Sequence, residues 1–198
     1  MLEALSITFG YAKGDKPLYE DYSLEVAPGE RVALVAPSGR GKTTLCRLLA
    51  GYERPWSGEV LCDGSPLPSS GTCPVQLIGQ HPELAVDPRL RMEKTLAEAG
   101  DVSDELLAAL GIRQEWMRRY PHELSGGELQ RFCIARAVTC RPHYLIADEV
   151  STMLDALTQA QIWHFLLNWQ AESGAGLVLV SHSPALVERV ATRKVLIG

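Results

Sequence analysis

Short apolar runs alternate with amphipathic segments along this chain. Three of the runs are rich in branched residues and bounded by turn formers: RVALV at 31–35, YLIAD at 144–148 and LVLVS at 177–181. Strands buried on both faces of a parallel sheet show this composition. Helical spacing of apolar residues occupies 42–50, 128–139 and 158–170. The alternation predicts an α/β fold in which helices flank a parallel sheet.

Two regions depart from that alternation. Near the N-terminus, LEALSIT at 2–8 and YSLEV at 22–26 predict a pair of antiparallel strands. Residues 88–119 are charged and helical in pattern, without a strand signal, and they predict a small helical subdomain at about 88–125. A length of 198 residues favours a single domain over 1–198.

Composition and charge narrow the class of protein. A hydrophobic content of 46% and a charged content of 22% are ordinary for a soluble domain. The net charge of -5 argues against a nucleic-acid partner, which normally meets a basic face. No apolar run approaches the roughly 18 residues of a membrane span, and the first ten residues lack a signal-peptide pattern. We therefore expect a cytoplasmic protein whose membrane role, if any, comes through a partner.

The cysteines are odd in number and widely spaced, without a C-x-x-C pair. They are Cys46, Cys62, Cys73, Cys133 and Cys140. This pattern favours free thiols in a reducing compartment over a disulfide framework or a zinc site. We expect them to pack as small hydrophobes.

Residues 36–43 match the P-loop pattern G-x-x-x-x-G-K-[ST], except at its first position. The segment follows a predicted strand and opens a predicted helix, which is the context that makes the motif specific and a chance glycine-rich turn a weak alternative. Amides at a helix N-terminus attract phosphate, Lys42 can reach the β- and γ-phosphates, and Thr43 can ligate Mg²⁺. The expected phosphate-binding residues are Ser38, Gly39, Arg40, Gly41, Lys42, Thr43 and Thr44.

Ala36 stands where the pattern has its first glycine. Pro37 follows, and a residue before proline is held in the β or polyproline region, where φ is negative. Alanine adopts this region of backbone conformation without strain. The glycines that must approach phosphate closely are both present, so we expect the substitution to cost little.

The stretch LSGGE at 124–128, followed by a helix with Gln130 and Arg131, resembles the signature motif of ABC-type ATPases. Ser125 and the amides of Gly126 and Gly127 form a second anion cradle at a helix N-terminus. The P-loop already provides one cradle in the same chain. The resemblance implies that the second closes over ATP held by an opposite subunit.

PHYLIADE at 142–149 looks like the Walker B strand of the same family. It delivers two carboxylates after an apolar run: Asp148 to organise Mg²⁺ and Glu149 to orient or deprotonate water. A helix cap is the alternative for two such acids, and the spacing to LSGGE disfavours it. STMLD, ending at Asp155, occupies the position of the nucleotide-contacting D-loop.

Three more positions match the family by their order along the chain. His182 in VSHS corresponds to the switch histidine at the γ-phosphate, and Gln80 in LIGQHP to the Q-loop glutamine that senses Mg²⁺ and water. Tyr11 lies where the family places an aromatic on adenine, with Phe9 as the rival. An aromatic near the N-terminus is as easily a core residue.

Within the family, the neighbourhoods of these motifs look like the peptide and nickel importer ATPases. The matching stretches are QHPELAVDPRLRMEKTL at 80–96, RYPHELSGGELQR at 119–131 and DEVSTMLDALTQAQI at 148–162. An exporter or lipoprotein-releasing ATPase shares the core motifs but not this Q-loop neighbourhood. The chain departs from the branch at Ala36, at Val150 in place of proline, and in stopping at Gly198. None of these departures removes a catalytic side chain.

The resemblance implies an ATP-hydrolysing subunit of an importer for peptides, nickel or metal chelates, with ATP and Mg²⁺ as cofactors. Its expected partners are a second ATPase subunit, transmembrane permeases on the inner face of the membrane and, indirectly, a solute-binding protein. A non-transport ABC ATPase is disfavoured because the chain has no coiled-coil insertion or tandem domain. A second alternative is a hydrolysis-impaired subunit that is paired with an active sister subunit. Ala36 supports this alternative, and the intact Glu149 and His182 argue against it.

Overall fold

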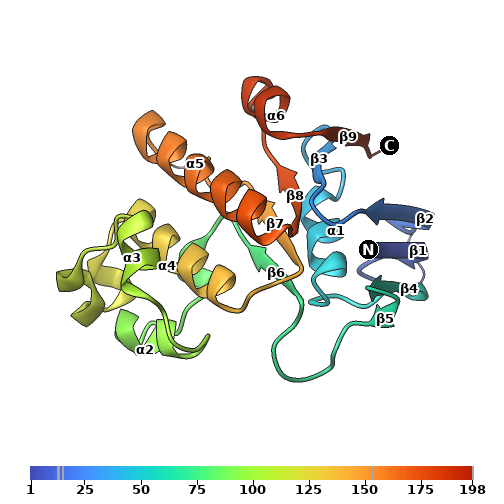
Figure 1. Ribbon diagram of the computed structural model, residues 1–198. Coiled ribbons are helices and arrows are strands. Elements are labelled where there is room, and N and C mark those ends of the chain that lie inside the picture. Colours follow the sequence, from blue (N-terminus) through green and yellow to red (C-terminus); the bar gives the residue numbers. More distant parts are fainter. Residues whose placement is uncertain (13, 15, 153, 198) are drawn as a thin grey trace.

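The computed structural model describes residues 1–12, 14, 16–152 and 154–197. Its strands form two sheets (Figure 1). The antiparallel sheet has the order β2-β1-β4-β5, with β1 at Leu2–Phe9, β2 at Tyr19–Val26, β4 at Ser57–Cys62 and β5 at Ser65–Pro66. The parallel sheet has the order β6-β7-β8-β3-β9, with β3 at Arg31–Val35, β6 at Val75–Ile78, β7 at Tyr144–Asp148, β8 at Gly176–Val180 and β9 at Arg193–Leu196.

The strands of the parallel sheet confirm the apolar runs in the sequence. Every residue of β7 and β8 is buried, because both faces of this sheet are covered and leave no polar alternation. Successive side chains nevertheless point to opposite faces. Leu177 and Leu179 belong to one hydrophobic core, and Val178 and Val180 to the other.

Helices α4 (Gly126–Thr139) and α5 (Ala156–Ser173) pack in the first core, together with α6 (Pro184–Val190). Helix α1 (Lys42–Leu49) and strands β1 and β2 pack in the second. The helical spacing at 42–50, 128–139 and 158–170 is thereby confirmed. Both α4 and α5 begin two residues before the apolar spacing does, because Ser125 and Asp155 cap their first amides.

Residues 92–118 contain no strand, as the sequence predicted. They form α2 (Met92–Ala97), α3 (Asp104–Ala109) and the 3₁₀ helix η2 (Gln114–Arg118), between η1 (Pro82–Leu84) and η3 (Pro121–Glu123). Met92, Leu110 and Trp116 are buried in the same core as Phe132 of α4. These helices lie on the side of the parallel sheet away from the antiparallel one (Figure 1).

The pairing of 2–8 with 22–26 is also confirmed, with Leu2 opposite Val26 in β1 and β2. Strands β4, β5 and β6 were not predicted. The first three residues of β4 are exposed and only its last is buried, and β5 has only two residues. In the part of the chain that the structure describes, no helix is long and apolar enough to cross a membrane.

Candidate functional site

A cleft of about 710 Å³ opens where β3 and β7 of the parallel sheet end. Ligands of open α/β sheets bind at this carboxyl edge, where the loops after the strands converge. The predicted residues that line the cleft are Tyr11, Ser38, Gly39, Gly41, Lys42, Thr43, Thr44, Gln80, Glu149 and His182. The fold therefore brings residues from five separate stretches of the chain to one site.

The loop between β3 and α1 depends on two glycines. Gly39 has a φ of 78° and Gly41 a φ of 89°, both in the left-handed region that glycine adopts most easily. A Cβ on Gly41 would lie 2.8 Å from the Tyr19 hydroxyl and 3.0 Å from the side chain of Leu18. The Tyr19 hydroxyl also donates to the Gly41 carbonyl at 2.9 Å. Gly41 is thus required both by its conformation and by its neighbours.

Lys42 is nearly buried under this loop. Its Nζ donates to the carbonyl oxygens of Ala36 at 2.9 Å and Pro37 at 3.1 Å. The first turn of α1 contains no acidic residue, so the positive end of the helix dipole and the ammonium act together at the cleft. Such a loop can hold a phosphate group.

Ala36 does not have a positive φ, as the sequence predicted, since the non-glycine residues with positive φ in the described chain are Ser6, Asp21, Asp63, Arg141 and Glu149. Its side chain packs against the core between the two sheets, and Ala36 is not among the residues that line the cleft. The methyl group therefore does not crowd a ligand bound in the loop.

Asp148 lies at the end of β7, next to Thr43. The carboxyl group is buried, which raises its pKa, while a hydrogen bond from the Thr43 hydroxyl acts in the opposite direction. Its Oδ1 has no hydrogen-bond partner among the described residues. A buried carboxylate oxygen left free beside a hydroxyl is a suitable ligand pair for a hard divalent cation such as Mg²⁺.

The side chains of Glu149 and His182 contact each other at the mouth of the cleft. Glu149 Oε1 lies 2.8 Å from His182 Nε2. Glu149 has a φ of 53°, an uncommon conformation for a residue with a long side chain and one that marks strained functional positions. Its amide donates to the Val180 carbonyl at 3.1 Å, which fixes this turn to the end of β8. A carboxylate held in this way can orient or deprotonate a water molecule.

Tyr11 and Phe9, the two candidates for the aromatic residue of the site, differ in their exposure. Phe9 is buried in the core below the cleft, whereas Tyr11 is 69% exposed and lines it. The Tyr11 ring contacts Phe9 edge-on at 5.3 Å, and its hydroxyl lies 2.8 Å from Thr44 Oγ1. Of these two aromatic residues, Tyr11 is the one exposed in the cleft.

Six predicted residues do not line the cleft: Arg40, Asp148, Ser125, Gly126, Gly127 and Asp155. The Ser125 hydroxyl accepts the Glu128 amide at 3.3 Å, and Glu128 Oε2 accepts the Ser125 amide at 2.7 Å. Asp155 Oδ1 accepts the amides of Leu157 and Thr158, both at 3.0 Å. In this single chain, both side chains cap their own helices.

Sequence reasoning missed four residues that line the cleft: Gly10, Lys16, Pro17 and Leu18. Lys16 adds a second cation opposite the loop of Lys42. A lone lysine between two predicted strands carries no signal of its own. It lies near the glycine-rich loop because Tyr19, shortly after it in the chain, donates to the Gly41 carbonyl.

The family model described as ABC transporter matches residues 19–152 of this chain. Three curated relatives cover most of the chain. The probable peptide ABC transporter ATP-binding protein y4tS of Sinorhizobium fredii is 34% identical over 94% of this chain and 59% of its own length. The glutathione import ATP-binding protein GsiA of Pectobacterium atrosepticum is 38% identical over 88% of this chain. The nickel import ATP-binding protein NikE of Rhodospirillum rubrum is 34% identical over 92% of this chain and 73% of its own length.

The chain spans 31% of the length of GsiA and 59% of that of y4tS. Among solved structures, the dimeric structure of MJ0796, a bacterial ABC transporter cassette, superposes with a TM-score of 0.85. That match covers 100% of this chain and 94% of the other at 24% identity, so it establishes the fold alone. The α/β architecture expected from the sequence is thereby confirmed.

Proposed function

Because this chain belongs to the ABC transporter family, we propose that it is the ATP-binding and ATP-hydrolysing subunit of an ABC importer. One observation carries the proposal. The loop of Lys42 and the contacting pair Glu149 and His182 line the cleft, and the buried carboxylate of Asp148 lies beside Thr43 of the same cleft. Phosphoryl transfer to water needs these three elements together.

ATP would lie with its phosphates over the loop at the start of α1. On binding, the Lys42 ammonium would leave the carbonyl oxygens of Ala36 and Pro37 for the β- and γ-phosphates. The Tyr11 ring would stack on adenine, since it is the exposed aromatic in the cleft. Thr43 and Asp148, with Gln80 nearby, would hold Mg²⁺, which neutralises charge on the phosphates.

Hydrolysis would use the contacting side chains of Glu149 and His182 at the cleft mouth. Glu149 would accept the proton of the attacking water, and His182 would hold the carboxylate in position and contact the γ-phosphate. The Glu149 amide donates to the Val180 carbonyl, which ties the backbone of Glu149 to the end of β8.

The signature segment would act on a second copy or on a sister subunit. Ser125, Gly126 and Gly127 open α4 away from the chain's own cleft, where their amides can meet the phosphates of a partner's ATP. Asp155 would lie at the same junction. Two ATP molecules would then be enclosed between two subunits.

The direction of transport and the solute class come from the relatives. Their printed names refer to a peptide transporter, glutathione import and nickel import. We therefore place this chain on the inner face of the membrane, bound to permeases that a solute-binding protein serves, with peptides, nickel or metal chelates as cargo.

Calorimetric titration of the purified chain with ATP and Mg²⁺, followed by measurement of phosphate release, tests the proposal. We expect saturable binding of one ATP per chain. The rate of hydrolysis per chain should rise with protein concentration, because the proposed active form is a dimer. Absence of ATP binding at millimolar concentration would contradict the proposed function.

Tyr11→Ala should weaken ATP binding by about 5-fold to 150-fold, since base–aromatic stacking contributes about 1–3 kcal/mol. Tyr11→Phe keeps the ring and loses only the contact with Thr44, so its affinity should stay near that of the wild type. Tyr52→Ala removes an equally exposed tyrosine outside the cleft and serves as the control. Equal affinities of all four proteins would remove Tyr11 from the site.

Ala36→Gly should leave the affinity for ATP nearly unchanged, because the alanine methyl group points into the core. The free energy of unfolding should fall by about 0.4–1 kcal/mol, since glycine gives the unfolded chain more backbone freedom. Calorimetry and denaturant unfolding measure the two effects. A tenfold gain in affinity would instead favour an ATPase subunit that binds poorly by nature and works beside an active sister.

A further inference from the structure

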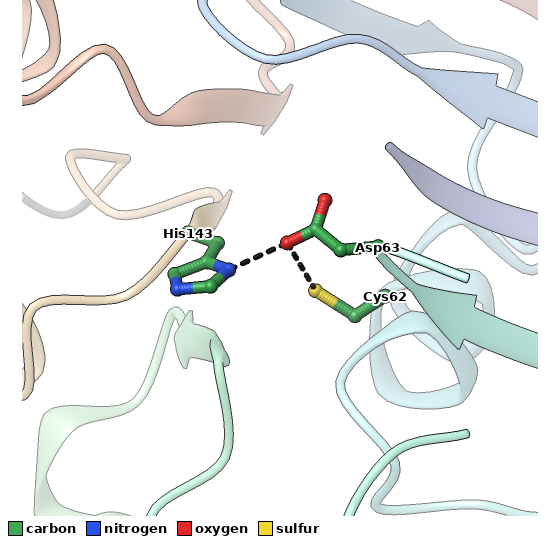
Figure 2. Close-up of side chains that lie close together, drawn as sticks. All are labelled: Cys62, Asp63 and His143. Carbon is green, nitrogen blue, oxygen red and sulfur yellow. Dashed lines mark hydrogen bonds and ion pairs between the residues drawn. The ribbon is translucent and has the colours of Figure 1, made fainter. Parts of the chain in front are cut away.

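Cys62, Asp63 and His143 meet at the end of β7 opposite to Asp148, outside the cleft (Figure 2). Cys62 closes β4, Asp63 begins the turn to β5, and His143 directly precedes β7. The cluster therefore links the antiparallel sheet to the parallel one. His143 and Asp63 lie 80 positions apart in the sequence.

The three side chains present their polar atoms to one another. His143 Nδ1 lies 2.6 Å from Asp63 Oδ2, and Cys62 Sγ lies 3.8 Å from the same oxygen. All three potential ligand atoms lie within 4.8 Å of one another. Around a tetrahedral zinc ion, ligand atoms are about 3.3–3.8 Å apart, given Zn–S bonds of about 2.3 Å and Zn–N and Zn–O bonds of about 2.0–2.2 Å. The nitrogen–oxygen pair would have to open by less than about 1 Å.

The backbone holds these residues in place. Asp63 has a φ of 52° and Gly64 a φ of 75°, as in the tight Asp-Gly turn of a β-hairpin. The Asp63 amide donates to the Met1 carbonyl at 2.8 Å, and the His143 amide donates to the Pro74 carbonyl at 2.8 Å. Only side-chain rotation is then needed to admit an ion, and a fixed scaffold of this kind lowers the entropy that binding costs.

We propose that Cys62, Asp63 and His143 form a zinc-binding site, with water as the fourth ligand. A thiolate, an imidazole and a carboxylate together suit Zn²⁺, whereas Mg²⁺ prefers oxygen ligands alone. The thiolate and the carboxylate supply two negative charges to a dication. The Cys62 thiol would give its proton to the solvent on binding, and His143 would bind through Nδ1.

The site is open on one side only. Cys62 is 6% exposed, while the side chains of Asp63 and His143 are 46% and 62% exposed. His143 and Asp63 also line a cavity of about 430 Å³, through which water and an ion can reach the cluster. The amino group of Met1 lies 2.5 Å from Asp63 Oδ1, the other carboxylate oxygen, so that Oδ2 faces the thiol and the imidazole.

The proposal departs from the expectation of unliganded thiols. That expectation considered only the spacing of cysteines, and this cluster is built across two sheets from residues that no spacing pattern connects. It is independent of the nucleotide cleft, so it can stand whether or not the chain hydrolyses ATP.

The whole chain, stripped of metal and kept reduced without added thiols or nucleotide, is titrated with Zn²⁺ by calorimetry. The same protein is titrated with Co²⁺, whose absorption spectrum reports a bound thiolate. We expect one Zn²⁺ per chain and a thiolate-to-cobalt band. His143→Gln and Cys62→Ser should each weaken Zn²⁺ binding by at least about tenfold, since even outer partners of zinc ligands matter by 10–100-fold.

Two variants serve as matched controls. Cys73→Ser removes a thiol outside the cluster, and His81→Gln removes another histidine beside a carboxylate, 3.1 Å from Glu83, that belongs to no group of three such ligands among the described residues. Both should bind Zn²⁺ as the wild type does. His143 is largely exposed, so His143→Gln should fold even if Cys62→Ser does not. The absence of saturable binding, a cobalt spectrum without the thiolate band, or unchanged binding in His143→Gln would each overturn the proposal.

Discussion

Glu149→Gln should lower the rate of ATP hydrolysis by about 10²–10⁴-fold, the usual loss when a general base is removed. Glutamine keeps the shape of the side chain and can still bond His182 across the 2.8 Å contact. What it loses is the negative charge that accepts a proton from water. ATP binding depends on the loop of Lys42 and should stay within a few-fold of the wild type. The variant should therefore accumulate as an ATP-bound dimer.

Phosphate release in the steady state and the size of the ATP-bound species measure these effects. Glu188→Gln is the control, because Glu188 is an acid on α6 paired with Lys194 and lies outside the cleft. It should hydrolyse ATP as the wild type does. Turnover of Glu149→Gln within a few-fold of the wild type would show that another group activates the water.

Ser125→Arg should reduce hydrolysis by about 10²-fold, comparable to the loss of preorganised donors at a developing charge, while ATP binding to the same chain persists. An arginine at the start of α4 places a long cation where a partner's phosphates would meet the amides of Gly126 and Gly127. The chain's own cleft is not lined by Ser125 and should be unaffected. Measurements of equilibrium ATP binding and of phosphate release on the same protein distinguish an effect on hydrolysis from an effect on ATP binding.

Ser125 also caps α4, so Ser125→Arg should cost about 1 kcal/mol of stability regardless of function. Ser103→Arg provides the matched control, because the Ser103 hydroxyl accepts the Leu106 amide at 3.2 Å and caps α3 in the same way. Its stability should fall similarly while its turnover stays intact. If monomeric Ser125→Arg lost ATP binding outright, the signature would act within its own chain, against the two-subunit model.

The sequence by itself determined the features that are local in the chain. The apolar runs became β3, β7 and β8, because burial on both faces leaves a strand no polar alternation. The spacing of glycines, lysine and threonine between a strand and a helix predicted the loop now seen at 39–43. The negative φ expected for Ala36 before Pro37 follows from a steric clash between neighbours, which needs no tertiary contact, and Ala36 is not among the residues with positive φ in the described chain.

Only the tertiary structure decided which distant residues meet. Tyr11 rather than Phe9 reaches the cleft, because Phe9 is the buried last residue of β1 and Tyr11 lies in the exposed segment after it. The position of Lys16 in the cleft and the cluster of Cys62 with His143 were missed because tertiary packing, and no pattern in the sequence, brings these residues to their neighbours. A strand pattern predicts which faces are buried, but it does not fix which strands are neighbours. That choice depends on the free energy of packing the whole chain, and it is this packing that brings the ends of separate strands together at one edge of the sheet.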